Sequence, residues 1–436
     1  MVYALDLAKA QQEFGDDVSL LTMGSFSLRD SRPAIIRAKR YNNLTAFEIR
    51  NPLPYGMSNG IANPDLYLEH KSANNFKSFF EHEKYDVVHV HSLIGLYPSV
   101  LRAAKQAGAK IVYTTHDYYG ICCKPERLRY NDEICEAKNF DRCYECAKYA
   151  FGYRRMQIEQ TKVFQKAKSY AWFNRFMDML MHVRAKLRNS HDDAQQLYEQ
   201  VEEILPELVK QYKLLENQYR QMLQMMDVIH FNSSQTRKIY EAYMGPMVGK
   251  VIPIMTAGIC DKRCHRDRIN EESLHIGFIG NSKAYKGLPD LVKCLDEINK
   301  EKNKIILHTY GVLEYADRTY MVHHKSFTQN ELDKVYAEFD LLVVPSLWQE
   351  TFSIVTLEAI SRGMPCIVSE HVGAKDIVRR IDEELIFHNL EDLKYKLENA
   401  YDNSSKLDDY KNKLMSLNMD FDFGHYVQEM KKELYR

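Results

Sequence analysis

Residues 345–359 read Pro-Ser-Leu-Trp-Gln-Glu-Thr-Phe-Ser-Ile-Val-Thr-Leu-Glu-Ala, which places one carboxylate at Glu350 and a second eight positions later at Glu358. The apolar run that ends at Pro345 predicts a buried strand, and the pattern after Glu350 predicts a helix that continues through Ile360. Glu350 is therefore expected at the start of this helix, and Glu358 about two turns along it. Two glutamates on one helix usually form a solvated face, so the surrounding sequence determines how they are interpreted.

A glycine-flanked turn precedes this stretch. Residues 278–287 read Phe-Ile-Gly-Asn-Ser-Lys-Ala-Tyr-Lys-Gly, so that Lys286 lies in a tight turn directly after an apolar strand. Similar apolar runs predict strands at 17–22, 86–91, 110–115, 274–280, 304–311, 341–345 and 364–369, with helices such as 93–106 and 288–299 between them. Such uniformly apolar runs favour parallel sheets covered on both faces, and hence an α/β chain of two doubly wound domains.

Lys286, Glu350 and Glu358, in this order and with these glycines and strands around them, resemble the donor half of the family 4 retaining glycosyltransferases. That family has the two-domain GT-B fold, and members of the resembling type build bacterial capsular polysaccharides and exopolysaccharides. The resemblance implies an acceptor-binding domain at 1–245 with a helical insertion at about 150–226, and a nucleotide-sugar-binding domain at 246–418. It also implies a final helix at 419–436 that crosses back to the first domain.

The resemblance implies a donor site for a nucleotide diphosphate sugar, with UDP and GDP both open. Lys286 would supply a cation to the departing diphosphate, and Gly280 would let the backbone approach the phosphates. Family members usually carry an arginine directly after this glycine, whereas this chain has Asn281, and Lys283 would partly restore the charge.

The paired glutamates complete the implied donor site. Glu350 would orient the sugar, and Glu358 would hold the ribose hydroxyls, because a carboxylate can accept two hydroxyl hydrogens. Backbone amides at the start of the helix would face the diphosphate. The expected donor-binding residues are Gly280, Asn281, Lys283, Lys286, Thr351, Phe352, Ser353, Ile354, Val355 and Glu358. Where this chain has Ser353, family members usually have glycine.

The implied reaction is glycosyl transfer with retention and without a metal, since lysine and amide dipoles would take the metal's place. The expected catalytic residues are Glu350, Lys286 and His116. The histidine follows the predicted strand at 110–115, where family members place one that faces the transferred sugar. The acceptor would be a saccharide or a lipid-linked saccharide.

Five of the nine cysteines lie between Cys122 and Cys146. Cys143 and Cys146 have the C-x-x-C spacing of zinc ligands, and Cys122 and Cys135 would complete a tetrahedron around a structural zinc. Plain reduced thiols and a disulfide remain alternatives.

Residues 151–190 form a basic segment with aromatic residues among nine Lys and Arg and two acidic residues, whereas 191–216 hold seven Asp and Glu against two Lys. A helix of basic and aromatic residues is typical of a membrane surface contact, and a hairpin whose two arms pair is the alternative. The net charge of −1 gives no sign of nucleic-acid binding. The sequence lacks an 18-residue apolar run and a signal-peptide pattern, and its irregular cysteines favour a reducing setting. We therefore expect a cytoplasmic protein, located at the inner face of the membrane if the contact forms.

The resembling family begins with a strand and a glycine-rich turn, whereas this chain opens directly in the helix that follows them. The first strand is therefore expected to be missing, through either a start codon placed too late or a truncated form. Two rival functions share the fold: a non-catalytic partner subunit, and a nucleotide-sugar epimerase. Asn281 and Ser353 favour the silent subunit, and the intact Lys286, Glu350 and Glu358 oppose it.

Overall fold

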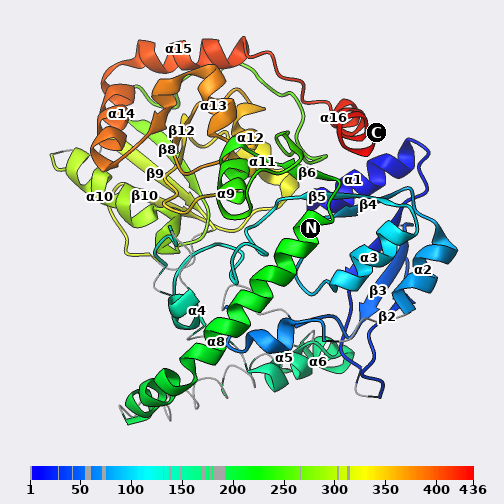
Figure 1. Cartoon of the computed structure of the whole chain (residues 1–436). Helices are drawn as coiled ribbons and strands as arrows, with labels where there is room; N and C mark the ends of the chain where they lie inside the picture. Colours follow the sequence, from blue (N-terminus) through cyan, green and yellow to red (C-terminus); the bar gives the residue numbers. More distant parts are fainter. Residues whose placement is uncertain are drawn as a thin grey trace. The chain divides into compact units, whose positions relative to one another are not determined.

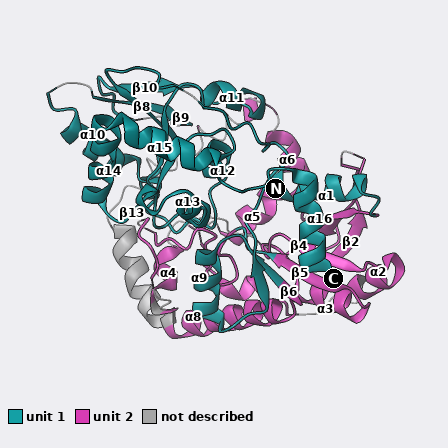
Figure 2. Cartoon of the chain, turned by 90° about the horizontal axis from the view of Figure 1, so that it is seen from above, with its two compact units in different colours: residues 1–16, 114–116, 229–436 teal, residues 17–113, 117–228 magenta. Residues whose placement is uncertain are grey.

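The computed structural model describes residues 2–436 except 28, 42, 55–59, 71–74, 131, 137–139, 148, 149, 151, 169, 171, 174, 176–178, 180–191, 266, 302, 303 and 312–314. The chain divides into two compact units, which Figure 2 shows in different colours. Unit 1 comprises residues 1–16, 114–116 and 229–436, and unit 2 comprises 17–113 and 117–228.

Unit 1 is built on a six-stranded sheet with the order β10-β9-β8-β11-β12-β13, in which every strand pair is parallel. The strands are β8 (Leu274–Ile279), β9 (Ile305–Tyr310), β10 (Met321–His324), β11 (Leu341–Val344), β12 (Cys366–Ser369) and β13 (Ile386–Phe387). Every residue of β11 and β12 is buried, as expected for central strands of a sheet covered on both faces. Figure 1 shows α10 (Leu288–Ile298) and α14 (Leu390–Asp402) on one side of this sheet and α12 (Ile354–Ile360) on the other.

The two ends of the chain meet in unit 1. α16 (Phe423–Met430) packs against α1 (Val2–Glu13), and the hydroxyls of Tyr3 and Tyr426 lie 2.9 Å apart. Lys431 forms an ion pair with Asp16 at 2.6 Å. Unit 1 also contains α9 (Ser234–Met244), α11 (Leu332–Val335), α13 (Lys375–Ile381), α15 (Ser404–Met415) and the parallel pair of β6 (Val228–Phe231) and β7 (Gly249–Val251). The domain limits at 245 and 418 stay a prediction.

Unit 2 contains a three-stranded sheet with the order β1-β3-β2 and the parallel pair of β4 and β5. The strands are β1 (Ser19–Met23), β2 (Ala34–Arg37), β3 (Thr45–Arg50), β4 (Val87–Val90) and β5 (Lys110–Thr114). The sequence analysis missed β2 and β3, and β2 is antiparallel to β3, whereas we predicted parallel sheets. β2 has three half-buried residues and one exposed residue, and β3 mixes buried and half-buried residues, so neither has the continuous apolar run that marks a central parallel strand.

Helices make up most of the remainder of unit 2: α2 (Asn75–Glu83), α3 (Pro98–Gln106), α4 (Phe140–Cys146), α5 (Tyr153–Glu159), α6 (Lys162–Lys168) and α8 (Asp192–Gln224). α8 runs past α3 and α4 and past the short η2 turn (Pro64–Tyr67), and it contacts all three. Of the predicted basic segment at 151–190, residues 151, 169, 171, 174, 176–178 and 180–190 lie outside the described residues. Among the helices that the structure describes, none is long and apolar enough to cross a membrane.

Candidate functional site

Lys286 is positioned by a turn that only glycine can complete. β8 ends at Ile279, and a short 3-10 turn, η3 (Ala284–Lys286), stops at Gly287, whose φ is +79°. A Cβ on Gly287 would lie 1.8 Å from the carbonyl oxygen of Pro345 at the end of β11. The missing side chain therefore lets the lysine turn pack directly against the loop that carries the first glutamate.

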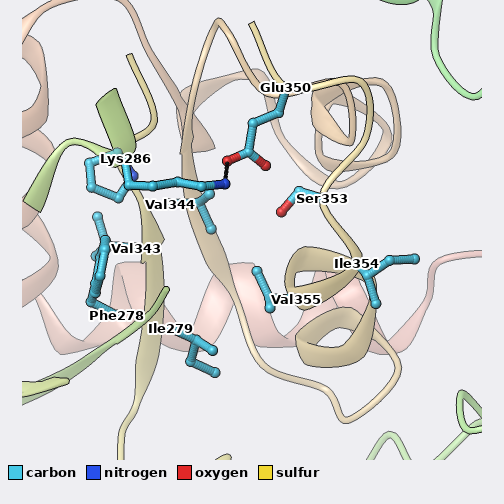
Figure 3. A pocket seen from close by; sticks show the side chains of 10 residues that line it. Phe278, Ile279, Lys286, Val343, Val344, Glu350, Ser353, Ile354 and Val355 are labelled. Atoms are coloured by element: carbon cyan, nitrogen blue, oxygen red, sulfur yellow. Dashed lines mark hydrogen bonds and ion pairs between the residues drawn. The ribbon is translucent and has the colours of Figure 1, made fainter. Parts of the chain in front are cut away.

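That loop places Glu350 against Lys286. The backbone N–H of Glu350 donates to the carbonyls of Trp348 (2.8 Å) and His371 (2.9 Å). Its Oε1 lies 2.5 Å from Lys286 Nζ, and the two side chains point toward each other in Figure 3. The lysine ammonium also lies 5.1 Å from the centre of the Trp348 ring. Since the Glu350 side chain is only 9% exposed, this ion pair is largely withdrawn from water.

A cavity of about 170 Å³ opens beside the ion pair. Its wall is apolar apart from the ion pair and one hydroxyl, and it comprises Phe278, Ile279, Lys286, Val343, Val344, Pro345, Glu350, Ser353, Ile354 and Val355 (Figure 3). The wall thus combines the ends of β8 and β11 with the start of α12. Ligands of open parallel sheets bind at such carboxyl ends, and a cation with a carboxylate can hold an anionic group that also bears hydroxyls.

Ser353 enters this wall in a strained conformation. Its φ is +115° and its ψ is 92°, a region that residues with a Cβ rarely adopt. Its Oγ accepts a hydrogen bond from Thr356 Oγ1 at 3.0 Å. The backbone of Ser353 therefore has a geometry that favours glycine, and members of the family that this chain resembles usually have glycine at this position.

Of the predicted donor-binding residues, Lys286, Ser353, Ile354 and Val355 line the cavity, together with the predicted catalytic residue Glu350. Glu358 does not line it. Its Oε2 accepts a hydrogen bond from Tyr336 at 3.1 Å, and burial raises the pKa of this carboxyl above its usual range. The sequence analysis missed Tyr336, which lies in the loop after α11, because no motif marks it.

The other predicted donor-binding residues lie around the cavity wall rather than in it. Asn281 and Lys283 are exposed, and Asn281 Oδ1 accepts from the backbone N–H of Lys283 at 3.1 Å. Gly280 donates its N–H to the carbonyl of Tyr310, which joins the ends of β8 and β9. The side chains of Thr351 and Phe352 are buried, at 7% and 3% exposure.

Thr351 connects the predicted histidine to the glutamate loop. Its Oγ1 donates to the carbonyl of His116 at 3.0 Å, while its own carbonyl accepts from Ser233 at 2.7 Å and from Thr236 at 3.0 Å. The ring of His116 lies 5.2 Å from that of Tyr3 and does not line the cavity. The roles predicted for these site residues stay predictions.

In the part of the chain that the structure describes, the cysteines of unit 2 form no disulfide, contrary to the disulfide alternative. Cys122, Cys135, Cys143 and Cys146 are all half-buried. Within the part of the chain that the structure describes, no three His, Cys, Asp or Glu side chains are grouped so that they could hold a metal ion. The structural zinc therefore gains no support from the described geometry and stays a prediction.

Comparison with known proteins found a matching family model in each half of the chain. A family model for "Glycosyltransferase Family 4" matches residues 2–142, and one for "Glycosyl transferases group 1" matches residues 265–414. An uncharacterized protein from the cps region of Klebsiella pneumoniae is 27% identical over 120 residues, which are 27% of this chain and 33% of that protein. An uncharacterized glycosyltransferase of Methanocaldococcus jannaschii is 30% identical over 121 residues, which are 26% of this chain and 31% of that protein. The chain thus spans about a third of these relatives.

Solved structures match over almost the whole chain. Sucrose-phosphate synthase from Thermosynechococcus elongatus superposes with a TM-score of 0.52 at 13% identity, covering 99% of this chain and 91% of that one. A structure described as "Trehalose-6-phosphate from E. coli bound with UDP-2-fluoro glucose" gives a TM-score of 0.51 at 10% identity and covers 100% of this chain and 96% of that one. At this identity the likeness shows the fold, which is the predicted GT-B arrangement of two Rossmann-like domains. With this fold and with a glycosyltransferase family model matched in each half of the chain, the chain belongs to the glycosyltransferases of GT-B fold.

Proposed function

We propose that this protein is a retaining glycosyltransferase that moves a sugar from a UDP- or GDP-sugar to a saccharide or a lipid-linked saccharide during surface polysaccharide biosynthesis. The observation that carries the proposal is the Lys286–Glu350 ion pair in the wall of the cavity at the ends of β8 and β11. Family membership and a relative from a cps region support it. Fold neighbours bound to UDP-2-fluoro glucose, or to ADP with acarbose, support a nucleotide-sugar donor.

The ion pair suggests how the site would respond to its donor. Without a ligand, Glu350 Oε1 holds the lysine ammonium in place. An incoming diphosphate carries more negative charge than a carboxylate and would compete for that ammonium. Glu350 would then be released to accept sugar hydroxyls, so donor binding and sugar orientation would be coupled through one lysine.

During transfer, the bond between the anomeric carbon and the diphosphate oxygen breaks, and negative charge accumulates on the diphosphate. Lys286 stabilises that charge, which is the usual way in which a fixed cation lowers such a barrier. The acceptor hydroxyl attacks from the face that the diphosphate leaves, and a leaving-group oxygen takes its proton. Retention of the anomeric configuration follows from this same-face attack.

The exposed surface of unit 2 around α5 and α6 fits a membrane contact. Ile158, Val163, Tyr170 and Trp172 are 56%, 77%, 48% and 65% exposed, and they lie among lysines such as Lys166. Apolar side chains that lie in water beside cations are the composition of interfacial helices on anionic lipid. We propose that this surface holds the enzyme at the cytoplasmic face of a membrane, where a lipid-linked acceptor would be presented. The side chains of 192–205 are not described, so the alternative pairing with the acidic arm also stays a prediction.

Calorimetry with UDP and with GDP tests the donor site directly. One nucleotide should bind, and Lys286→Ala should weaken that binding by about tenfold or more, since a charge-assisted contact is lost. Glu350→Gln should bind the same nucleotide at least as tightly but lose turnover of the matching sugar donor. Binding of neither nucleotide would favour the silent subunit, and conversion of the donor to an epimer without acceptor would favour the epimerase.

Vesicle sedimentation tests the membrane contact separately. Wild-type protein should sediment with vesicles that contain about one third phosphatidylglycerol, and not with purely zwitterionic vesicles. Trp172→Ala with Val163→Ala should reduce the bound fraction, whereas Leu347→Ala, an equally apolar change at a 39% exposed residue of unit 1, should not. Equal sedimentation of both variants would contradict the proposed surface.

A further inference from the structure

A second cavity, of about 240 Å³, lies within unit 2 and involves none of the residues assigned above. Three elements line it: the turn after η2, α3 and α8. Its polar lining residues are Glu69, His70, Arg102, Asn217, Gln218 and Gln221, and its apolar ones are Leu68, Pro98 and Leu214. The carboxylate and the guanidinium of this lining, Glu69 and Arg102, form an ion pair with each other, so the cavity is better suited to binding than to transfer.

Hydrogen bonds fix the polar wall before any ligand arrives. Gln218 on α8 donates its side-chain N–H to the carbonyl of Tyr67 at 3.0 Å, and its Oε1 accepts from the backbone N–H of Glu69 at 2.8 Å. Glu69 Oε2 accepts from the backbone N–H of Ser99 at 3.0 Å and from Arg102 Nη2 at 2.8 Å. A wall held in this way loses little conformational entropy when a ligand binds.

The carboxylate and the guanidinium of the lining, Glu69 and Arg102, neutralise each other in an ion pair. A ligand with a net charge would compete with this pair, so a neutral ligand fits better.

One oxygen of the Glu69 carboxylate still lacks a hydrogen-bond donor. Its side chain is only 4% exposed, and its Oε1 is buried without a hydrogen-bond partner. A carboxylate oxygen accepts only from donors, and an O–H is the donor that a neutral ligand offers most readily. A buried oxygen left without a donor costs about 1–3 kcal/mol, so a ligand hydroxyl that reached this oxygen would be favoured.

The rest of the lining fits a sugar ring. The amides of Asn217 and Gln221 can donate and accept, as the hydroxyls of a sugar require. Leu68, Pro98 and the 47% exposed Leu214 offer apolar surface to the C–H face of a ring. Because the volume is below the usual range of pockets for larger ligands, we expect one ring rather than a longer segment.

We propose that this cavity is a non-catalytic subsite that binds one neutral pyranose. The inference goes beyond the proposed transfer, because the subsite would bind its sugar whether or not the donor cavity is active. A saccharide bound there would stay on unit 2, which contains most of the predicted acceptor-binding domain, between successive transfer reactions.

Saturation-transfer NMR on the full chain with the methyl glycosides of glucose, galactose, mannose and N-acetylglucosamine tests this proposal. At least one glycoside should bind, in the weak millimolar range expected for a single ring. Asn217→Leu and Leu214→Trp, both on α8, should each weaken binding by about tenfold by removing an amide or filling the cavity. Lys210→Ala, a change at a 69% exposed side chain of the same helix, should leave it unchanged.

Three results would overturn the subsite. The first is that none of the four glycosides binds, and the second is that binding is equal in the wild type and both cavity variants. The third is loss of binding in Lys286→Ala, which would place the sugar in the donor cavity instead. Calorimetry with the nucleotide keeps the two questions apart, because Asn217→Leu and Leu214→Trp should bind it like the wild type.

Discussion

Acidification should destabilise unit 1 through one buried histidine, His230 in β6. Its side chain is fully buried; Nε2–H donates to the carbonyl of Ile252 at 2.7 Å, and Nδ1 lies 2.9 Å from Thr114 Oγ1. Burial disfavours the charged imidazolium and lowers the pKa of His230 from 6.5 to about 4. Between pH 6.5 and 4, His230 is therefore protonated in the unfolded chain but stays neutral in the folded chain.

The size of the effect follows from these two pKa values. A tenfold difference in proton affinity is worth about 1.4 kcal/mol. The difference between 6.5 and about 4 thus amounts to about 3 kcal/mol. Stability from this group is fully present above pH 6.5 and falls as the pH drops, with about 2 kcal/mol already lost at pH 5.

Urea unfolding at pH 7 and pH 5 measures this loss by comparing the wild type with His230→Gln. The glutamine cannot be protonated, so the free-energy gap between the two proteins should shrink by about 2 kcal/mol from pH 7 to pH 5. Other titrating groups, including His308, whose pKa burial also lowers to about 4, act on both proteins and cancel. The chain has two tryptophans, so in a Trp172→Phe background the fluorescence of Trp348 alone reports the unfolding of unit 1.

The matched control is His265→Gln, at an exposed histidine of the same unit, which should leave the pH dependence of the wild type intact. The reasoning fails if the gap between wild type and His230→Gln is the same at both pH values. In that case the folded state would accept the proton on His230 despite its burial.

Two backbone predictions concern the cavity wall. Ser353→Gly should stabilise unit 1 by about 1–2 kcal/mol, because glycine adopts a φ of +115° without strain; an unchanged or lowered urea midpoint would contradict the strain. Gly287→Ala should cost more than about 2 kcal/mol, since its Cβ would meet the Pro345 carbonyl at 1.8 Å. Gly15→Ala is its control: its φ is +91°, but a Cβ there meets nothing within 4 Å, so it should cost only about 1 kcal/mol. If the two alanine variants lose the same free energy of unfolding, the contact with the Pro345 carbonyl is not the reason why position 287 requires glycine.

Part of the candidate site could be predicted because its residues are close in sequence to strand ends. Lys286 and Glu350 follow β8 and β11, which are neighbours in the sheet, so the two side chains had to meet at one edge. Glu358 could not be placed in the same way. Its helix turns it toward Tyr336, and that contact depends on how α11 packs, which no local pattern encodes.

The sequence by itself determined the α/β class, the parallel sheet of unit 1 and the order of Lys286, Glu350 and Glu358 along the chain. These follow from apolar periodicity and from glycines in turns, which act over a few residues. Only the tertiary structure decided which carboxylate reaches the lysine, and that Ser353 keeps a glycine-like backbone. It alone also brought Glu69, Arg102 and Gln218 together, because hydrogen bonds across as many as 151 positions depend on helix packing that local sequence does not specify.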